Sequence, residues 1–139
     1  MSQSQDLWKM IKDTVLDVDM DTHIERAWIF LLNRRNMVIG YQLMSQGGLN
    51  GTAMDPRLIT QLAVQFQVSA VMLVHNHPSG NLISSQQDRE MTRKAKDALA
   101  VHEISLLDHI IYAPKFIEGR NVETGDDFHY YSFSDEGML

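Results

Sequence analysis

The sequence has 139 residues, of which 44% are hydrophobic, and a formal net charge of −6 at pH 7. This length is enough for one domain with a single buried core, and the hydrophobic fraction excludes an intrinsically disordered chain. The negative charge argues against a protein that binds duplex nucleic acid mainly through its phosphates, and the absence of cysteine excludes disulfides, thiolate nucleophiles and cysteine-based zinc sites.

The first half of the chain is predicted to contain two helices and a hairpin. Apolar residues at helical spacing predict a helix over residues 5–16, followed by a polar connection over residues 17–23. Two apolar runs, residues 27–32 and 37–44, flank a polar turn and predict the strands of a hairpin. After a glycine-rich loop at residues 47–51, Asp55 and Pro56 are typical of a helix start, and the apolar spacing continues to about residue 67.

The second half predicts further strands and one long helix. The unbroken apolar run at residues 70–74 is typical of a strand buried on both faces. A helix capped by Ser84 or Ser85 is predicted over residues 86–100. The remaining expectations are a strand over residues 103–112 or two strands with a break, an exposed excursion at 114–128, an edge strand at 130–133 and a frayed end at 134–139. Together these elements predict an α/β fold of mixed α+β character, a mixed sheet flanked by helices.

No segment predicts export or membrane insertion. The first residues lack the basic and then apolar regions of a secretion signal, and the apolar run at residues 27–32 is far shorter than the roughly 20 residues of a membrane span. We therefore expect a soluble cytoplasmic protein without a membrane partner.

The segment from His75 to Asp88 carries the candidate chemistry. On an extended chain His75 and His77 point the same way, and they come just after the predicted buried strand. Ser85 and Asp88 have the spacing of a capping box, which puts the carboxylate in the first turn of the next helix, where the helix dipole favours its charge. Two imidazoles and one carboxylate would hold zinc and leave a fourth position for water, as in catalytic sites. Glu25 is the candidate base that would take the proton of that water.

Simpler interpretations stay open at this point. An isolated pair of histidines separated by one residue is common, Asp88 on its own is more typical of a helix cap than of a metal ligand, and Glu25 alone is typical of a solvated surface acid. Arg89, Arg93 and Lys96 would form a small basic stripe on a helix, for which a solvated face is the simpler interpretation.

The same residues resemble a known family. His75, His77, Pro78, Ser85 and Asp88 reproduce, without a gap, the motif of the JAMM (MPN-plus) metalloproteases. The sequence is similar to the RadC branch of that superfamily in four further segments: Glu25 to Asn33, Gly48 to Thr52, Pro56-Arg57 and Leu106 to Ile110. The likeness covers residues 25–133, preceded by a helix and connection at 1–24 and followed by a tail at 134–139.

This resemblance implies a fold and a chemistry. The expected fold is the cytidine-deaminase-like JAB/MPN sandwich, with one zinc or other divalent ion per chain on His75, His77 and Asp88. Glu25 would act as general acid and base, and Ser85 would bond the water or the oxyanion, in the hydrolysis of a peptide or isopeptide bond of a peptide or protein substrate. Asp108 and His109 would orient a ligand imidazole or form a buried structural pair. RadC proteins are also associated with DNA repair.

Two departures and one alternative function complete the predictions. Leu58 stands where the family usually has glutamate, and the excursion at residues 114–128 is longer than usual. The alternative is a non-catalytic or nuclease-like accessory protein in DNA repair or mobile-element processing, with a mainly structural metal. The net charge of −6 does not support nucleic acid as its partner.

Overall fold

The computed structural model describes residues 3–47 and 54–139, and over these residues the chain forms a five-stranded mixed sheet. The strands lie in the order β2-β1-β3-β4-β5, and of the neighbouring pairs only β3 and β4 are parallel. Their bounds are Arg26–Leu32 (β1), Val38–Gln46 (β2), Ala70–Asn76 (β3), Ser105–Pro114 (β4) and Phe128–Ser132 (β5). The loop predicted at residues 47–51 and the likeness noted from Gly48 to Thr52 fall almost entirely outside the described residues.

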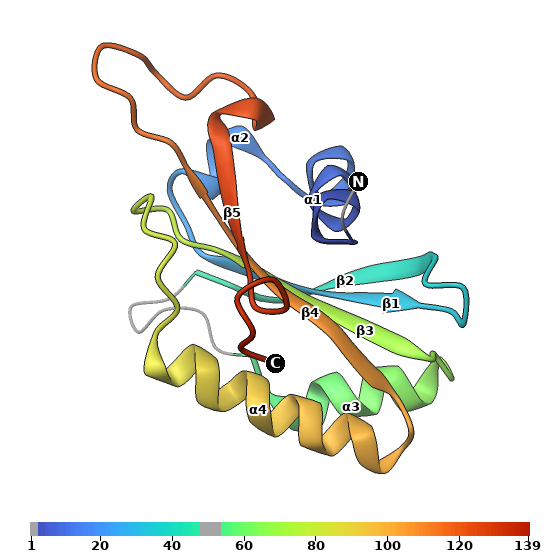
Figure 1. Ribbon diagram of the computed structural model, residues 1–139. Helices are drawn as coiled ribbons and strands as arrows, with labels where there is room; N and C mark the ends of the chain where they lie inside the picture. Colours follow the sequence, from blue (N-terminus) through green and yellow to red (C-terminus); the bar gives the residue numbers. More distant parts are fainter. Residues whose placement is uncertain (1–2, 48–53) are drawn as a thin grey trace.

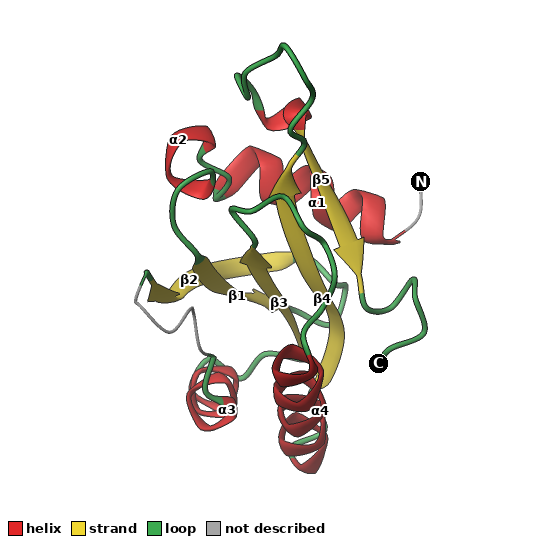
Figure 2. Cartoon of the chain, turned by 90° about the vertical axis from the view of Figure 1, so that its left-hand side faces the viewer, coloured by secondary structure: helices red, strands yellow, loops and turns green. Residues whose placement is uncertain are grey.

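Helices cover both faces of this sheet (Figure 1; Figure 2). The helices α3 (Pro56–Gln65) and α4 (Gln86–Val101) lie against one face, and α1 (Gln3–Thr14) lies against the other. The short helix α2 (Val18–Asp21) follows α1, and a 3-10 turn, η1 (Gly125–Asp127), precedes β5. The predicted mixed sheet flanked by helices is therefore confirmed. None of the described helices is long and apolar enough to cross a bilayer.

The central strand β3 is buried along its whole length and divides the interior into two cores. Val71 and Leu73 pack toward α3 and α4, whereas Met72 and Val74 pack toward α1. This alternation follows from the period of two along a strand, and it confirms the predicted strand with two buried faces. His75 continues the series of Val71 and Leu73, so its side chain takes the α3 and α4 side.

The first helices differ from their predicted bounds. The helix α1 begins at Gln3 and ends at Thr14, because the backbone N–H of Leu16 bonds to the Ile11 carbonyl outside the α-helical pattern. The predicted connection at residues 17–23 contains α2, for which the Asp17 side chain accepts bonds from two backbone N–H groups of the first turn. The helix α3 ends two residues early, since Gln67 takes a positive φ of 52°.

Two strands differ from their predicted bounds. The strand β3 includes His75 and Asn76, because His75 is paired on both edges, with Ala27 of β1 and with Ile111 of β4. The expectation that His75 lies past the end of the strand is therefore wrong. The strand β4 is continuous, and the alternative of two strands with a break is also wrong. Its pairing with β3 shifts by one residue at Leu107, and such a bulge absorbs an extra residue without ending the strand.

The predicted excursion at residues 114–128 is shorter in the structure. Pro114 and Phe128 belong to β4 and β5 and are paired with each other. The buried Asp127 closes the loop between them, because its carboxylate accepts the backbone N–H groups of Glu123 and Thr124. Most of the intervening side chains are exposed, as expected for an excursion.

The C-terminal residues 134–139 form turns against the body of the molecule, so the predicted fraying is wrong. The backbone N–H of Ser134 donates to the buried Asp108 carboxylate at 3.0 Å. The hydroxyl of Ser4 in α1 donates to the Asp135 carboxylate, and the Met138 N–H donates to a backbone carbonyl at 2.8 Å. These bonds connect the C-terminal residues to β4 and to α1. Local sequence patterns cannot predict such contacts, because the partners are distant in sequence.

A buried ion pair joins α2 to the sheet. Arg26 Nε donates to Asp21 Oδ1 at 2.8 Å, and the Tyr112 hydroxyl donates to Asp21 Oδ2 at 2.7 Å. Both charged side chains are almost completely hidden from solvent. Burial acts to lower the pKa of Arg26, but the bond and charge of Asp21 outweigh it and raise that pKa, so the guanidinium stays charged.

We predict that Asp21→Ala destabilises the protein strongly. The substitution leaves the Arg26 guanidinium buried without its counter-charge, a loss that costs about 3 kcal/mol or more in other proteins. Urea unfolding of the variant and of wild type measures the difference. Asp13→Ala is the control, since Asp13 forms an exposed pair with Lys9 in which its side chain is 63% accessible. Equal unfolding midpoints for Asp21→Ala and wild type would contradict the prediction.

Candidate metal centre

The strand β3 presents two histidines at its carboxyl end, on the face covered by α3 and α4. His75 is the sixth residue of the strand, and His77 follows directly after its last residue. The backbone N–H of His77 donates to the Tyr112 carbonyl at 2.9 Å, which prolongs the extended chain by one step. Because residues two apart on an extended chain point the same way, the two rings are neighbours, with centroids 4.9 Å apart.

The helix α4 supplies the third group, Asp88. The Ser85 hydroxyl accepts the Asp88 backbone N–H, and the Asp88 carboxylate accepts the Ser85 backbone N–H, both at 3.0 Å. The predicted capping box is thus confirmed, and it holds the carboxylate in the first turn of the helix. Thr92, Ala95 and Leu99 follow Asp88 on the buried side of α4, so this side faces the sheet.

The three side chains converge. His75 Nε2 lies 3.1 Å from His77 Nε2 and 3.6 Å from Asp88 Oδ2, and His77 Nε2 lies 3.8 Å from the same oxygen. The point equidistant from three atoms so arranged lies about 2.0 Å from each, which is the length of a zinc–nitrogen or zinc–oxygen bond. The residues predicted as ligands therefore fit a single small ion.

The chemistry of the donor atoms also fits a cation. The Asn81 carbonyl can only accept, so His77 donates to it from Nδ1, at 2.7 Å, and a neutral ring then carries a lone pair on Nε2. Burial, and next the charge of His75, lower the pKa of His77, which favours this neutral form. Burial acts to raise the pKa of Asp88, but the neighbouring His75 ring and the bonds with Ser85 outweigh it and hold that pKa well below its usual range. Acceptor atoms this close repel one another unless a proton or a metal ion lies between them.

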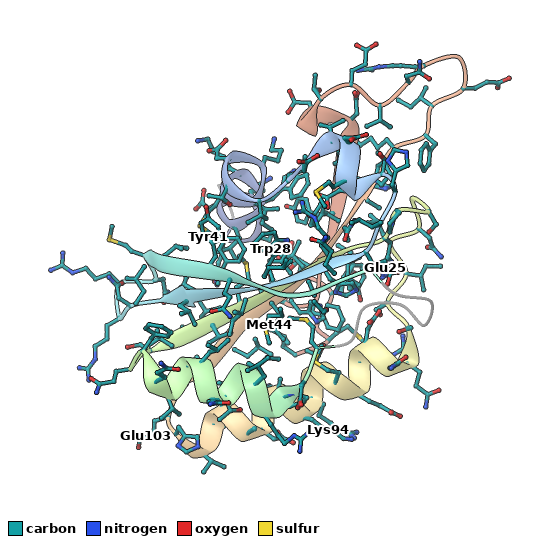
Figure 3. All side chains as sticks on the ribbon, turned by 180° about the vertical axis from the view of Figure 1, so that it is seen from behind. Glu25, Trp28, Tyr41, Met44, Lys94 and Glu103 are labelled. Atoms are coloured by element: carbon teal, nitrogen blue, oxygen red, sulfur yellow. The ribbon has the colours of Figure 1, made fainter. Side chains whose placement is uncertain are left out.

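Glu25 lies at the same end of the sheet, directly before β1 (Figure 3). Since Ala27 pairs with His75 in antiparallel register, Glu25 falls opposite His77 when the register is extended by two residues. The negative charge of Glu25 is one of the influences that act to raise the pKa of His77, after the stronger opposing effects of burial and of His75. The backbone carbonyl of Glu25 accepts the Gly47 N–H at 2.8 Å.

The completely buried Asn76, between the two histidines, holds the backbone around Glu25. Its side-chain oxygen accepts the Arg26 backbone N–H at 2.6 Å, and its side-chain nitrogen donates to the Ile24 carbonyl at 2.9 Å. One amide thus fixes the peptide groups on both sides of Glu25. The same nitrogen donates to the Asp21 carbonyl at 3.0 Å, which connects the site to the buried ion pair.

Ser85 is the N-cap of α4, so the alternative of Ser84 as the cap is wrong. Ser84 is buried, and its carbonyl and hydroxyl oxygens both accept bonds from Arg89. Capping does not prevent Ser85 from donating a bond to a substrate, because a hydroxyl that accepts one bond keeps its own proton for donation.

Asp108 and His109 have different partners. His109 Nε2 lies 2.7 Å from His75 Nδ1, behind the candidate metal centre. The Asp108 carboxylate instead accepts the Ser132 hydroxyl at 2.6 Å and a backbone N–H of the C-terminal segment, and burial raises its pKa against the effect of these bonds. Of the two predicted roles, the geometry thus connects orientation of a ligand imidazole with His109 and a structural contact with Asp108.

A cleft of about 250 Å³ opens onto His75 and Asp88. The starts of α3 and α4 form its walls, with the lining residues Met54, Pro56, Gln87, Glu90, Met91 and Lys94. Leu58 is partly exposed on α3 and is not among these lining residues.

Three residues of the site escaped the sequence-based prediction. Thr92 lies one helical turn after Asp88, so helical spacing would have placed it beside the carboxylate. Asn76 lies between the two histidines and points away from them, as the period of a strand requires. Asn81 contributes only its backbone carbonyl, for which the sequence carries no signal.

Comparisons with known proteins identify a family and several relatives of this chain. A family model described as the RadC-like JAB domain matches residues 1–138. A UPF0758 protein of Porphyromonas gingivalis is 36% identical over 131 residues, which cover 94% of this chain and 52% of that protein. The UPF0758 protein YfjY of Escherichia coli K12 is 32% identical over 115 residues, which cover 83% of this chain and 64% of that protein.

A third relative also matches most of this chain. A UPF0758 protein of Flavobacterium johnsoniae is 37% identical over 115 residues, covering 83% of this chain and 44% of that protein. The chain spans about half the length of the first curated relatives it matches. The family model takes in α1 and the C-terminal turns as well as residues 25–133. The chain belongs to the RadC-like JAB domain family.

Proposed function

We propose that this chain is a zinc-dependent hydrolase of the JAMM type that cleaves a peptide or isopeptide bond. The observation that carries the proposal is the convergence of two imidazole nitrogens and one carboxylate oxygen, 3.1 to 3.8 Å apart, beside an open cleft. Membership of the RadC-like JAB domain family supports the proposal, because such domains are often hydrolytic.

The number of donors favours a catalytic metal over a structural one. Structural zinc sites are closed by four protein ligands, whereas catalytic sites use three and leave a position for water or substrate. In the described part of the chain, the group that could hold a metal consists of His75, His77 and Asp88. Two of these residues border the cleft, so a substrate can reach them.

The roles of the residues follow from their positions. A metal held by the three donors would polarise the substrate carbonyl and lower the pKa of a neighbouring water. Glu25 accepts a proton from this water as the water oxygen adds to the carbonyl carbon. Glu25 then returns the proton to the leaving nitrogen as the carbon–nitrogen bond breaks. The Ser85 hydroxyl donates a hydrogen bond to the carbonyl oxygen, on which negative charge develops.

A peptide or protein substrate is favoured over nucleic acid. The formal net charge of −6 opposes binding to phosphates. In the basic stripe predicted on α4, the Arg89 guanidinium donates to the Ser84 carbonyl at 2.7 Å and is therefore engaged in the fold. Nucleases with two metal ions need several carboxylates, whereas the described cluster contains only that of Asp88. A cytoplasmic location remains part of the proposal from the sequence patterns, and a link to DNA repair remains part of it from the family resemblance alone.

We predict that His77→Ala and Asp88→Ala each abolish zinc uptake. Elemental analysis of purified wild type should find one zinc per chain, and each variant should contain none. Zinc at 100 times its dissociation constant should stabilise the wild type by about 2.7 kcal/mol in thermal or urea unfolding and leave both variants unaffected. The control is His102→Ala, which removes an exposed histidine at the end of α4. Zinc retained by either ligand variant would contradict the assignment.

We predict that Glu25→Gln keeps the metal and loses turnover. The amide has the shape of the carboxylate but accepts no proton, so kcat should fall by roughly 10²- to 10⁴-fold. A peptide-library cleavage assay with zinc-loaded protein measures the loss. Glu103→Gln provides the same chemical change at an exposed carboxylate far from the site (Figure 3) and should leave kcat unchanged. Unimpaired turnover in Glu25→Gln would mean that another group is the base.

We predict that two substitutions of Ser85 separate its two roles. Ser85→Ala removes both the cap and the hydroxyl donor, and it should lower stability by about 1 kcal/mol as well as kcat. Ser85→Gly keeps most of the capping preference, so stability should fall by only about a few tenths of a kcal/mol, while kcat falls as in Ser85→Ala. Urea unfolding and the cleavage assay measure the two effects. A fully active Ser85→Gly would restrict Ser85 to capping.

A further inference from the structure

Behind the candidate metal centre, three buried side chains form a series of short contacts that ends on His75. Thr92 Oγ1 lies 2.6 Å from the Asp88 backbone carbonyl and 2.6 Å from His109 Nδ1. His109 Nε2 lies 2.7 Å from His75 Nδ1. Thr92 is 2% exposed and His109 is completely buried, so these polar atoms must satisfy one another.

With both imidazoles uncharged, only one arrangement of protons turns all three contacts into hydrogen bonds. The Asp88 carbonyl can only accept, so it takes the single hydroxyl proton of Thr92. The Thr92 oxygen must then accept from His109, which places the ring proton of His109 on Nδ1. The described contacts of this ring are a hydroxyl, an imidazole and the stacked Phe133 ring, none of them anionic, and complete burial therefore favours the uncharged form. His109 Nε2 consequently accepts, and His75 donates from Nδ1.

We propose that Thr92 is a positioning residue of the metal centre, which acts through His109 to hold His75 in the tautomer with a lone pair on Nε2. This inference rests on the metal site of the proposed function. The opposite tautomer would carry a proton on Nε2, the atom that lies 3.1 Å from His77 Nε2 and 3.6 Å from Asp88. A metal would have to displace that proton before it could bind.

The identity of the acceptor explains why a further residue is needed. Ligand histidines usually donate their second N–H to a carbonyl or carboxylate, which can only accept and so sets the tautomer by itself. His77 follows this rule with the Asn81 carbonyl. The partner of His75 is another imidazole, which can donate or accept from the same nitrogen. The direction of that bond is therefore undetermined until Thr92, whose own proton is bound to the Asp88 carbonyl, imposes it.

The first test uses the metal-free protein and needs no activity. Two-bond ¹H–¹⁵N correlation spectra of ¹⁵N-labelled protein distinguish the two neutral tautomers of each imidazole. We expect His75 and His109 both to carry their proton on Nδ1 in the wild type and in Thr92→Ser, which keeps the hydroxyl. In Thr92→Val we expect a mixture of tautomers for both rings. A wild-type His109 protonated on Nε2 would overturn the proposed direction of the chain.

The second test measures zinc affinity by competition with a chromophoric chelator at a single pH. Thr92→Val should bind zinc about 10- to 100-fold more weakly than wild type, the range found when outer partners of metal ligands are removed. Thr92→Ser should bind as wild type does. Thr60→Val is the matched control, because Thr60 makes the same hydroxyl bond to the carbonyl four residues earlier, at 2.8 Å, in α3. Wild-type affinity in a folded Thr92→Val would overturn the role of Thr92.

The two tests separate this inference from the proposed function. If the wild type takes up no zinc, the metal site itself is wrong, and the inference about affinity falls with it. If the wild type binds zinc but Thr92→Val and Thr92→Ser are equally weakened, loss of packing rather than of the hydroxyl is responsible, and the positioning role is wrong. If zinc binds as predicted while no substrate is cleaved, the hydrolase proposal fails and the role of Thr92 stands.

Discussion

The pairing of β3 on both of its edges is the constraint on which the candidate site depends. At His75 the strand is bonded to β1 on one side and to β4 on the other, and the buried Leu73 on the same face holds this register. A slip of one residue would turn His75 and His77 away from α4, because side chains alternate with a period of two. The same register sets Glu25 opposite His77. The pairing of β1 with β3 therefore positions both the two candidate histidine ligands and the candidate base.

The two faces of the sheet carry buried polar networks that differ in how their charges are compensated. On the α1 side, Asp21 and Arg26 compensate each other, and the Tyr112 hydroxyl completes the carboxylate's bonds. On the α4 side, His77 donates outward to the Asn81 carbonyl and His75 contacts His109, and the Nε2 atoms of both ligand rings face the Asp88 carboxylate. The first network stabilises the fold without any further ion. The second brings together acceptor atoms that repel one another unless a proton or a metal ion lies between them, which makes it the better candidate for function.

Local patterns predicted the elements of this protein better than their ends. The apolar run of β3 and the capping box of Ser85 and Asp88 were recognisable, because burial on two faces and helix capping depend on neighbours in sequence. The extension of β3 to Asn76 and the continuity of β4 depend on pairing with distant strands. The ordered tail, tied to Asp108 and to α1, likewise depends on residues more than twenty positions away.

The sequence by itself determined the kind of site: two histidines on one side of an extended segment and a carboxylate in the first turn of a helix. The resemblance to a family motif indicated that these residues are candidate metal ligands. Only the tertiary structure decided that His77 bonds to Asn81, that His75 bonds to His109, and that Thr92 stands behind both His109 and Asp88. The physical reason is that residue types specify which atoms can donate or accept. The direction of each bond is set by the partner that the fold brings within about 3 Å.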